Sequence, residues 1–326
     1  MQSSEFMSER SRPAVAESLQ RSGPALIVEL RGRLGNQMFQ YAVGLVASEE
    51  QGCDLRFALG ANDFAVQGME KLAELIGPRF REASTRQLLR VGALPYRATG
   101  RGRVNTRLHV EAARVSRLLA RGGRAPLQVH HRSTSGYDPD VVRARPPVLL
   151  RGWFQNEKYF ESHAELVIES FVLPPVDAML PASLPRPLVA LLLRRSDYRK
   201  FGESLSVRYY QSALARLAED VEIGTLLVHS DEPTFAAEMV DLLAPVAEVV
   251  LDGTKIAPGA VAALAVTSSC DHFVISASTF AWWAAWIGEH RAGRDNVRVV
   301  APSRWFRSAS EIVPARWTRV PVDYET

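Results

Sequence analysis

Apolar residues in the second half of the chain form short continuous runs that alternate with stretches of helical periodicity. Runs at residues 188–193, 225–229, 248–251, 272–276 and 297–301 have the length of buried strands. Between them, apolar residues recur every three or four positions over 207–217, 233–243, 260–267 and 280–286. Unbroken apolar strands that are each followed by a helix predict a parallel sheet with helices on both faces.

The first half of the chain opens in the same way. Residues 25–28 predict a strand, and the glycines from Gly32 to Gly35 end it. From Asn36 onward the apolar residues have helical spacing, and further helices are predicted at 69–76 and 110–119, with a strand at 148–150. The whole pattern predicts an α/β fold of two Rossmann-like, doubly wound lobes.

A proline-rich stretch separates the two halves. Five prolines lie between Phe171 and Pro187, and proline has no backbone N–H to donate to a helix or a sheet. We expect an acceptor-side lobe over 23–175 and a nucleotide-sugar-binding lobe over 176–326. Residues 1–22 are expected to be a disordered tail, and MQSSEF ahead of Met7 is interpreted as a cloning remnant.

Composition narrows the class of protein. Hydrophobic residues make up 47% of the 326 residues, which is typical of a globular protein with a sizeable core. No apolar run reaches the ~18 residues of a membrane span, and no signal peptide is evident, so the expected location is the cytoplasm. The oligomeric state is left open. Cys53 and Cys270 are too few for a disulfide framework or a zinc site.

Charge adds one local feature. The net charge of +3 requires no nucleic-acid partner. From Arg81 to Arg124 there are eleven arginines and only two acidic residues. A solvated helical face is the favoured interpretation of this segment, and an anion-binding surface is the alternative.

Polar residues that could carry chemistry follow the predicted strands, where ligands bind in open α/β sheets. Gly32–Gln37 joins a strand to a helix, as a phosphate-binding turn or an ordinary turn does. Arg194 and Arg195 follow the strand at 188–193, and Asp197 can hold one guanidinium. Two forks of donors suit a diphosphate, and a surface salt bridge is the alternative.

Two further segments have both a binding and a structural interpretation. Ser230, Asp231 and Glu232 could contact a ribose or a base, or Ser230 or Asp231 could cap the helix that starts at Pro233. Hydroxyls at Ser278 and Thr279 suit a helix cap or a phosphate. The tryptophans at 282, 283 and 286 are interpreted as core residues.

Taken together, these segments resemble the α-1,2-fucosyltransferase family, glycosyltransferase family 11, which is related to peptide O-fucosyltransferases. Six ordered stretches carry the resemblance: GRLGNQMFQYA at 32–42, LRGWFQNEKYF at 150–160, RRSDY at 194–198, SDEP at 230–233, STFAWW at 278–283 and APSRWF at 301–306.

The resemblance implies a GT-B-like fold, GDP-fucose as donor, inversion at the anomeric carbon, and neither metal nor cofactor. Arg194 would neutralise the leaving β-phosphate with support from Arg195 and Asp197. Donor contacts would also come from Ser278, Thr279 and Phe280, and from Arg33 and Asn36 in the first lobe. A hydroxyl acceptor, a glycan or a small molecule, would enter between the lobes. Nucleic acid and stable membrane insertion are not expected.

The sequence departs from the family pattern at the base and the sugar. Leu192 replaces a histidine and Glu232 an aspartate, and in related fucosyltransferases both positions lie at the guanine. Ala277 and Ala281 replace Asn and Ser. We therefore expect a smaller preference for GDP over ADP, or an inverted one, unless another residue contacts the base.

Three functions remain open at this point. GDP-fucose transfer is favoured. The alternatives are transfer from another nucleotide sugar, such as an ADP-linked heptose or a deoxysugar, and a non-catalytic sugar-nucleotide- or glycan-binding protein. Glu29, Asp138 and Glu157 are unranked candidates for the general base.

Overall fold

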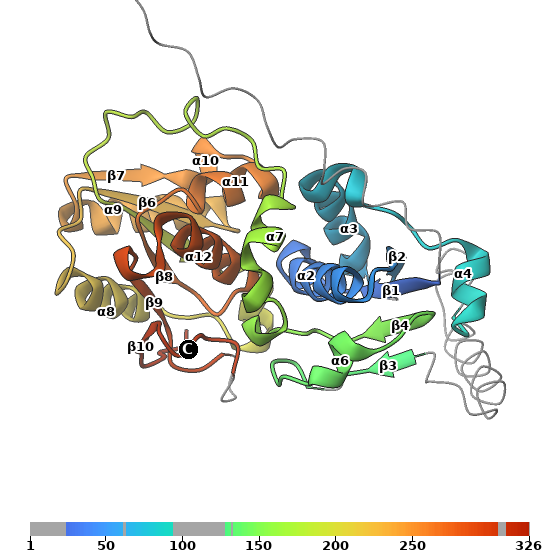
Figure 1. The fold of residues 1–326 in the computed structure, drawn as a ribbon. Helices are drawn as coiled ribbons and strands as arrows, with labels where there is room; N and C mark the ends of the chain where they lie inside the picture. The colour runs from blue at the N-terminus through green and yellow to red at the C-terminus, as the bar shows by residue number, and fades with distance from the viewer. Residues whose placement is uncertain (1–23, 61–62, 94–127, 132, 306–310, 326) are drawn as a thin grey trace, which may run out of the picture.

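The protein contains two parallel β-sheets, formed by the two halves of the chain (Figure 1). The computed structural model describes residues 24–60, 63–93, 128–131, 133–305 and 311–325. The first sheet has the order β2-β1-β4-β3. Its strands are β1 (Ala25–Leu30), β2 (Asp54–Leu59), β3 (Gln128–His130) and β4 (Val148–Arg151).

The second sheet has the strand order of a Rossmann fold. Its strands are β5 (Leu188–Leu193), β6 (Thr225–Ser230), β7 (Val249–Asp252), β8 (His272–Ile275), β9 (Val299–Pro302) and β10 (Thr318–Val320). The order β7-β6-β5-β8-β9-β10 corresponds to 3-2-1-4-5-6 in chain order, and every pairing is parallel. The predicted fold class is thereby confirmed.

Helices connect and cover both sheets (Figure 1). In the first half they are α2 (Leu34–Gln51), α3 (Asp63–Ile76), α4 (Thr85–Arg90), α6 (Pro139–Arg143) and α7 (Ala164–Glu169). In the second half they are α8 (Val207–Ala218), α9 (Pro233–Leu243), α10 (Gly253–Ile256), α11 (Ala260–Thr267) and α12 (Thr279–Ala292). None of these helices is long and apolar enough to cross a membrane.

Most of the predicted elements occur within a few residues of their expected bounds. One correction concerns α2, which begins at Leu34 and places Gly35 in its first turn, whereas the break was expected to extend through Gly35. Strands β2, β3 and β10 and the helices α4, α6, α7 and α10 were not predicted. Residues 171–187 form neither helix nor strand, as the prolines indicated. The expected tail and the expected helix at 110–119 lie outside the described residues.

The two halves share one hydrophobic core, in which α2 and α12 pack against each other. Phe39 of α2 contacts both Trp282 and Trp283, with ring centroids 4.6 and 5.0 Å away. The three tryptophans of α12 are fully buried, as predicted. The side-chain N–H of Trp283 donates to the carbonyl of Gly35 at 3.1 Å, which joins the start of α2 to α12.

Gly35 permits the close approach of these two helices. A Cβ atom at this position would lie 2.5 Å from the backbone nitrogen of Phe280 and 2.7 Å from the carbonyl carbon of Thr279. Real Cβ atoms do not come so close to backbone atoms, which cannot rotate away as a side chain does. The absence of a side chain at residue 35 therefore sets the distance between the halves beside the candidate site.

We expect Gly35→Ala to destabilise the protein by about 1–3 kcal/mol, the usual cost of overpacking a well-packed interface. Urea unfolding of the two proteins checks this value. Gly259→Ala is the control for space, because a Cβ there meets no atom within 4 Å and any cost comes from its positive φ of 99°. Equal stability of Gly35→Ala and the parent would show that α2 and α12 can separate freely.

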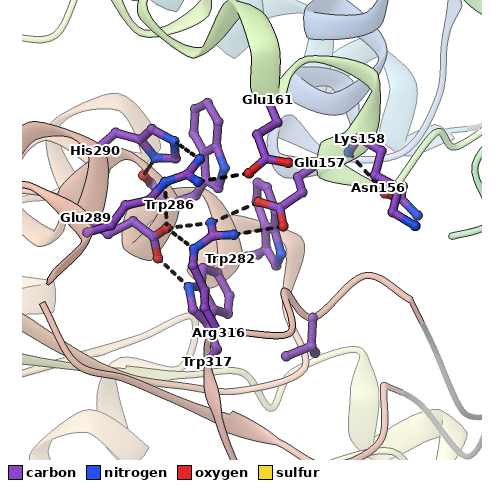
Figure 2. A network of polar contacts seen from close by, with 12 residues as sticks. Asn156, Glu157, Lys158, Glu161, Trp282, Trp286, Glu289, His290, Arg316 and Trp317 are labelled. Carbon is purple, nitrogen blue, oxygen red and sulfur yellow. Dashed lines mark hydrogen bonds and ion pairs between the residues drawn. The ribbon is translucent and has the colours of Figure 1, made fainter.

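A second link between the halves is a network of charged residues centred on Arg316 (Figure 2). The two terminal nitrogens of Arg316 each donate to one carboxylate oxygen of Glu157, at 2.8 Å. The same guanidinium pairs with Glu289 of α12, whose other oxygen accepts from the indole of Trp317. Glu157 follows β4 in the first half, so Arg316 joins the two halves through a bidentate ion pair.

Candidate functional site

Strand β5 lies at the centre of the second sheet, beside the point where the strand order reverses. Strands β6 and β7 lie on one side of β5, and strands β8 and β9 lie on the other. Residues that leave β5 and β8 at their C-terminal ends therefore face a shared crevice, which is where open α/β sheets bind ligands. Arg194 follows β5, and Ser276–Ser278 follow β8.

A cavity of about 640 Å³ opens at this position and is bounded by both halves of the chain. Its volume is within the range of small-molecule sites. The second half contributes the ends of β5 and β6 and parts of α10, α11 and α12, and the first half contributes the start of α2 and one face of α3. Seven of the predicted site residues line it: Arg33, Leu192, Arg194, Ser230, Asp231, Ser278 and Phe280.

Arg194 is held in place by two carboxylates. One terminal nitrogen donates to Asp197 at 2.6 Å, and the other lies 3.0 Å from Asp231. A guanidinium has five N–H donors, so these two contacts leave donors for a ligand in the cavity. Because the side chain is only 14% exposed, its charge is little screened by solvent. The group is thus fixed before any ligand arrives.

Asp197 also pairs with the first half of the chain. Its second oxygen lies 3.6 Å from the guanidinium of Arg33, the residue that precedes α2. Arg33 and Arg194 therefore meet at one carboxylate, one from each half. This arrangement brings two cations to the same wall of the cavity.

Arg195 has different partners from Arg194. It binds Glu325 at 2.8 Å, lies 3.6 Å from Glu232, and places its guanidinium 4.2 Å from the centre of the Phe235 ring. Neither Arg195 nor Glu232 lines the cavity. Arg195 supports the site from behind the sheet edge, with Glu325 as a partner that the sequence gave no reason to expect.

The expected helix cap at Ser230 or Asp231 is wrong. Glu232 occupies the N-cap position of α9, and its side chain makes no capping hydrogen bond. Asp231 instead accepts from the backbone N–H of Arg195 at 2.9 Å, from the hydroxyl of Ser196, and from Arg194. The Asp231 carboxylate is occupied by the arginine motif at the end of β5 and therefore does not cap α9.

Asn36 and Thr279 bind each other across the two halves. The hydroxyl of Thr279 donates to the side-chain oxygen of Asn36 at 3.1 Å, and Gln155 donates to the same oxygen at 2.8 Å. Neither Asn36 nor Thr279 lines the cavity, nor does Asp197. The contribution of Asn36, Thr279 and Asp197 to donor binding stays a prediction. In the structure, Asn36 and Thr279 join the two halves.

Ser278 and Phe280 begin α12 at the edge of the cavity. Ser278 occupies the N-cap position of this helix, but its hydroxyl makes no capping hydrogen bond. Phe280 stacks on His229, with ring centroids 6.0 Å apart and an angle of 28° between the planes. His229 itself lines the cavity, although the sequence gave it no role. Its position directly before Ser230 was the available indication.

The three candidates for the general base all have other partners. Glu29 pairs with Arg151 at 2.8 Å and with Arg31, Asp138 caps α6, and Glu157 binds Arg316. None of them lines the cavity. Elsewhere among the described residues, no group of three or more His, Cys, Asp or Glu side chains is arranged to hold a metal ion.

Comparison with known proteins agrees with this architecture. The chain is similar to an alpha-1,2-colitosyltransferase from Escherichia coli, at 24% identity over 314 residues, which covers 90% of this chain and 98% of the relative. Its fold resembles that of FUT1 from Arabidopsis thaliana in complex with GDP, with a TM-score of 0.51 and 13% identity over 92% of this chain and 74% of the other.

POFUT1 in complex with GDP-fucose matches with a TM-score of 0.47 and 13% identity, over 85% of this chain and 98% of the other. The sequence model of glycosyl transferase family 11 matches residues 146–317, which is more than half of the chain. These residues include β5, β6, β8 and the arginines that follow β5. The chain belongs to glycosyl transferase family 11 and is a glycosyltransferase.

Proposed function

We propose that the protein transfers fucose from GDP-fucose to a hydroxyl of a glycan or a small-molecule acceptor, with inversion at the anomeric carbon and without a metal ion. The observation that supports this most is Arg194, a cation fixed by two carboxylates at the strand-order reversal of a Rossmann sheet and open to a cavity of about 640 Å³. Such a crevice suits a nucleotide, and the guanidinium suits its diphosphate.

In the proposed reaction the acceptor oxygen forms a bond to the anomeric carbon while the bond from that carbon to the β-phosphate oxygen breaks. The acceptor hydroxyl passes its proton to water, and the departing nucleoside diphosphate takes the electron pair of the broken bond and gains negative charge. Arg194, with Arg33 beside it, lies where that charge would develop. A donor that is held in position before the reaction stabilises the transition state without reorganisation.

The position of Leu192 and the name of the E. coli relative support a second candidate for the sugar donor. Leu192, at the position of the family's histidine, lines the cavity as an apolar side chain, and the E. coli relative is described as a colitosyltransferase. A donor with a deoxysugar other than fucose, or with a base other than guanine, is therefore the second candidate. A non-catalytic binding protein is disfavoured, because it would not need a fixed cation at a leaving group.

The experiment that tests the proposed function has two parts. Thermal shift with GDP, ADP, UDP and dTDP identifies the base, and incubation with the matching nucleotide sugars shows by mass spectrometry whether diphosphate is released. Stabilisation by GDP and release of GDP from GDP-fucose are the expected results. Tight binding of a nucleotide without any donor cleavage would contradict the assignment as a transferase.

We predict that EDTA leaves the transfer rate within about twofold of the untreated rate. The reason is that Arg194 and Arg33 supply the positive charge that a metal ion supplies elsewhere. Initial rates after overnight dialysis against EDTA, with and without added Mg²⁺ or Mn²⁺, check the prediction. A large loss that either ion restores would show that a metal carries part of the leaving-group charge.

A further inference from the structure

His229 occupies a position that compensates for the missing histidine of β5. In the parallel pairing of β5 and β6, Leu192 and His229 are register partners, so they lie side by side on neighbouring strands. Both line the cavity. Neighbouring strands are about 4.8 Å apart, so the imidazole lies one strand from the place where the family motif would put it.

The ring of His229 is fixed and has one nitrogen that is open to a ligand. It stacks against Phe280. Its Nδ1 atom is enclosed, and the ring has one backbone contact of hydrogen-bonding type, with Gly253. An imidazole has two ring nitrogens, so this contact leaves one of them for a ligand in the cavity. Burial lowers the pKa of the ring, against the opposing effects of a Gly253 backbone group, Asp231 and Asp252, so the imidazole is neutral at neutral pH.

The polar groups of Ser230 and Asp231, which follow His229 in the chain, already have partners. Asp231 is bound by Arg194 and Ser196. The backbone N–H of Ser230 donates to the hydroxyl of Thr254 at 3.1 Å, and the Ser230 hydroxyl accepts from the backbone of Glu232. Leu192 has no polar atom. Arg194 has further N–H donors and Ser278 has a hydroxyl on this side of the cavity, and both are expected to face the diphosphate. His229, beside Leu192, is therefore the candidate for contact with the base.

We propose that His229 contacts the nucleotide base and determines which base the enzyme accepts, in place of the histidine that the chain lacks at residue 192. The inference rests on the proposed function, since it assumes that the cavity holds a nucleoside diphosphate with its phosphates at Arg194. Nε2 forms a hydrogen bond with the polar edge of the base, and Leu192 provides an apolar surface beside it. A neutral imidazole gives one directional bond, which suits recognition of a base edge.

The test compares His229→Phe with the parent by calorimetry, using GDP, ADP and inorganic pyrophosphate as ligands. Phenylalanine keeps an aromatic ring against Phe280 and removes the ring nitrogens. We expect the affinity for the preferred nucleotide to fall about tenfold, the usual effect of losing one hydrogen bond in a site of this kind, and the GDP-to-ADP ratio to move toward one. Pyrophosphate has no base, so its affinity should stay within twofold.

His272→Phe is the matched control, because His272 is in β8 of the same sheet, bonds the backbone of Arg298 at 3.0 Å and does not line the cavity. It should leave all three affinities within twofold. Unchanged nucleotide affinity in His229→Phe, or an equal loss of nucleotide and pyrophosphate affinity, would overturn the inference. A parent protein that binds neither nucleotide nor pyrophosphate would instead contradict the proposed function.

Discussion

Arg194→Ala should lower kcat at least about a hundredfold, which corresponds to roughly 3 kcal/mol of transition-state stabilisation. The guanidinium lies at the C-terminal end of β5 and is held by Asp197 and Asp231. In the variant, no cation fixed in this way faces the leaving diphosphate from β5. Steady-state kinetics with a saturating donor measure the loss, and circular dichroism shows whether the fold persists.

Two other arginines make the result interpretable. Arg216→Ala removes a surface residue of α8 that pairs with Glu219 and Asp220, and its kcat should stay within twofold of the parent value. Arg195→Ala should raise the donor KM more than it lowers kcat, because Arg195 does not line the cavity and acts through Glu325 and Glu232. Near-normal turnover of Arg194→Ala would show that the leaving group is stabilised elsewhere.

The second sheet could be predicted almost completely from the sequence, for a simple physical reason. Strands β5 and β8 are buried along their whole length, β5 is apolar throughout and β6 and β8 are apolar over most of their length, and each of the three is followed by a helix. Strand β10, which carries Thr318 and Arg319, was the one strand of this sheet that was not predicted. The first sheet was harder to predict. Strand β2 carries Asp54 and Arg56 in a six-residue segment and has only two fully buried positions, three residues apart, so it lacks the pattern of a strand. Strand β3 has three residues and no periodicity to detect.

The site was predictable as a set of residues but not as a set of contacts. The motif placed Arg194, Arg195 and Asp197 together, whereas their partners come from distant positions. Glu325 lies 130 residues from Arg195, and Asn36 meets Thr279 across 243 residues. Such pairs depend on how two sheets are oriented, and no local pattern in the sequence records that. His229 was overlooked because the register of β5 and β6 is what relates it to Leu192.

Arg316→Met should destabilise the protein by about 3–5 kcal/mol at neutral pH, since it removes one partner of a buried ion pair. Methionine keeps much of the volume of the arginine stem, and what is lost is the charge. Glu289 has a side chain only 3% exposed and pairs closely with Arg316, which also binds Glu157 (Figure 2). In the variant the remaining guanidinium near Glu289 is that of Arg294, at 3.9 Å, and the link from Arg316 to Glu157 is lost.

The pH dependence of the lost stability shows whether the cause is the unpaired charge of Glu289 or the loss of packing around residue 316. Burial raises the pKa of Glu289, and Arg316 opposes that effect, so the pKa should rise further in Arg316→Met. A carboxyl with a raised folded-state pKa binds its proton more tightly when folded, so the stability of the variant should increase as the pH falls toward that pKa. Urea unfolding at pH 7.5 and pH 5.5 should show a smaller deficit at the lower pH.

The double variant Glu289→Gln, Arg316→Met tests whether removal of the Glu289 charge restores the stability that Arg316→Met loses. Glutamine keeps an acceptor for the indole N–H of Trp317 and carries no charge, so most of the lost stability should return at pH 7.5. Glu157 is unchanged in all these proteins, and its side chain, 13% exposed, is closer to solvent than that of Glu289. A deficit that is equal at both pH values and is not repaired by Glu289→Gln would show that Arg316 stabilises the protein by packing and not by neutralising Glu289.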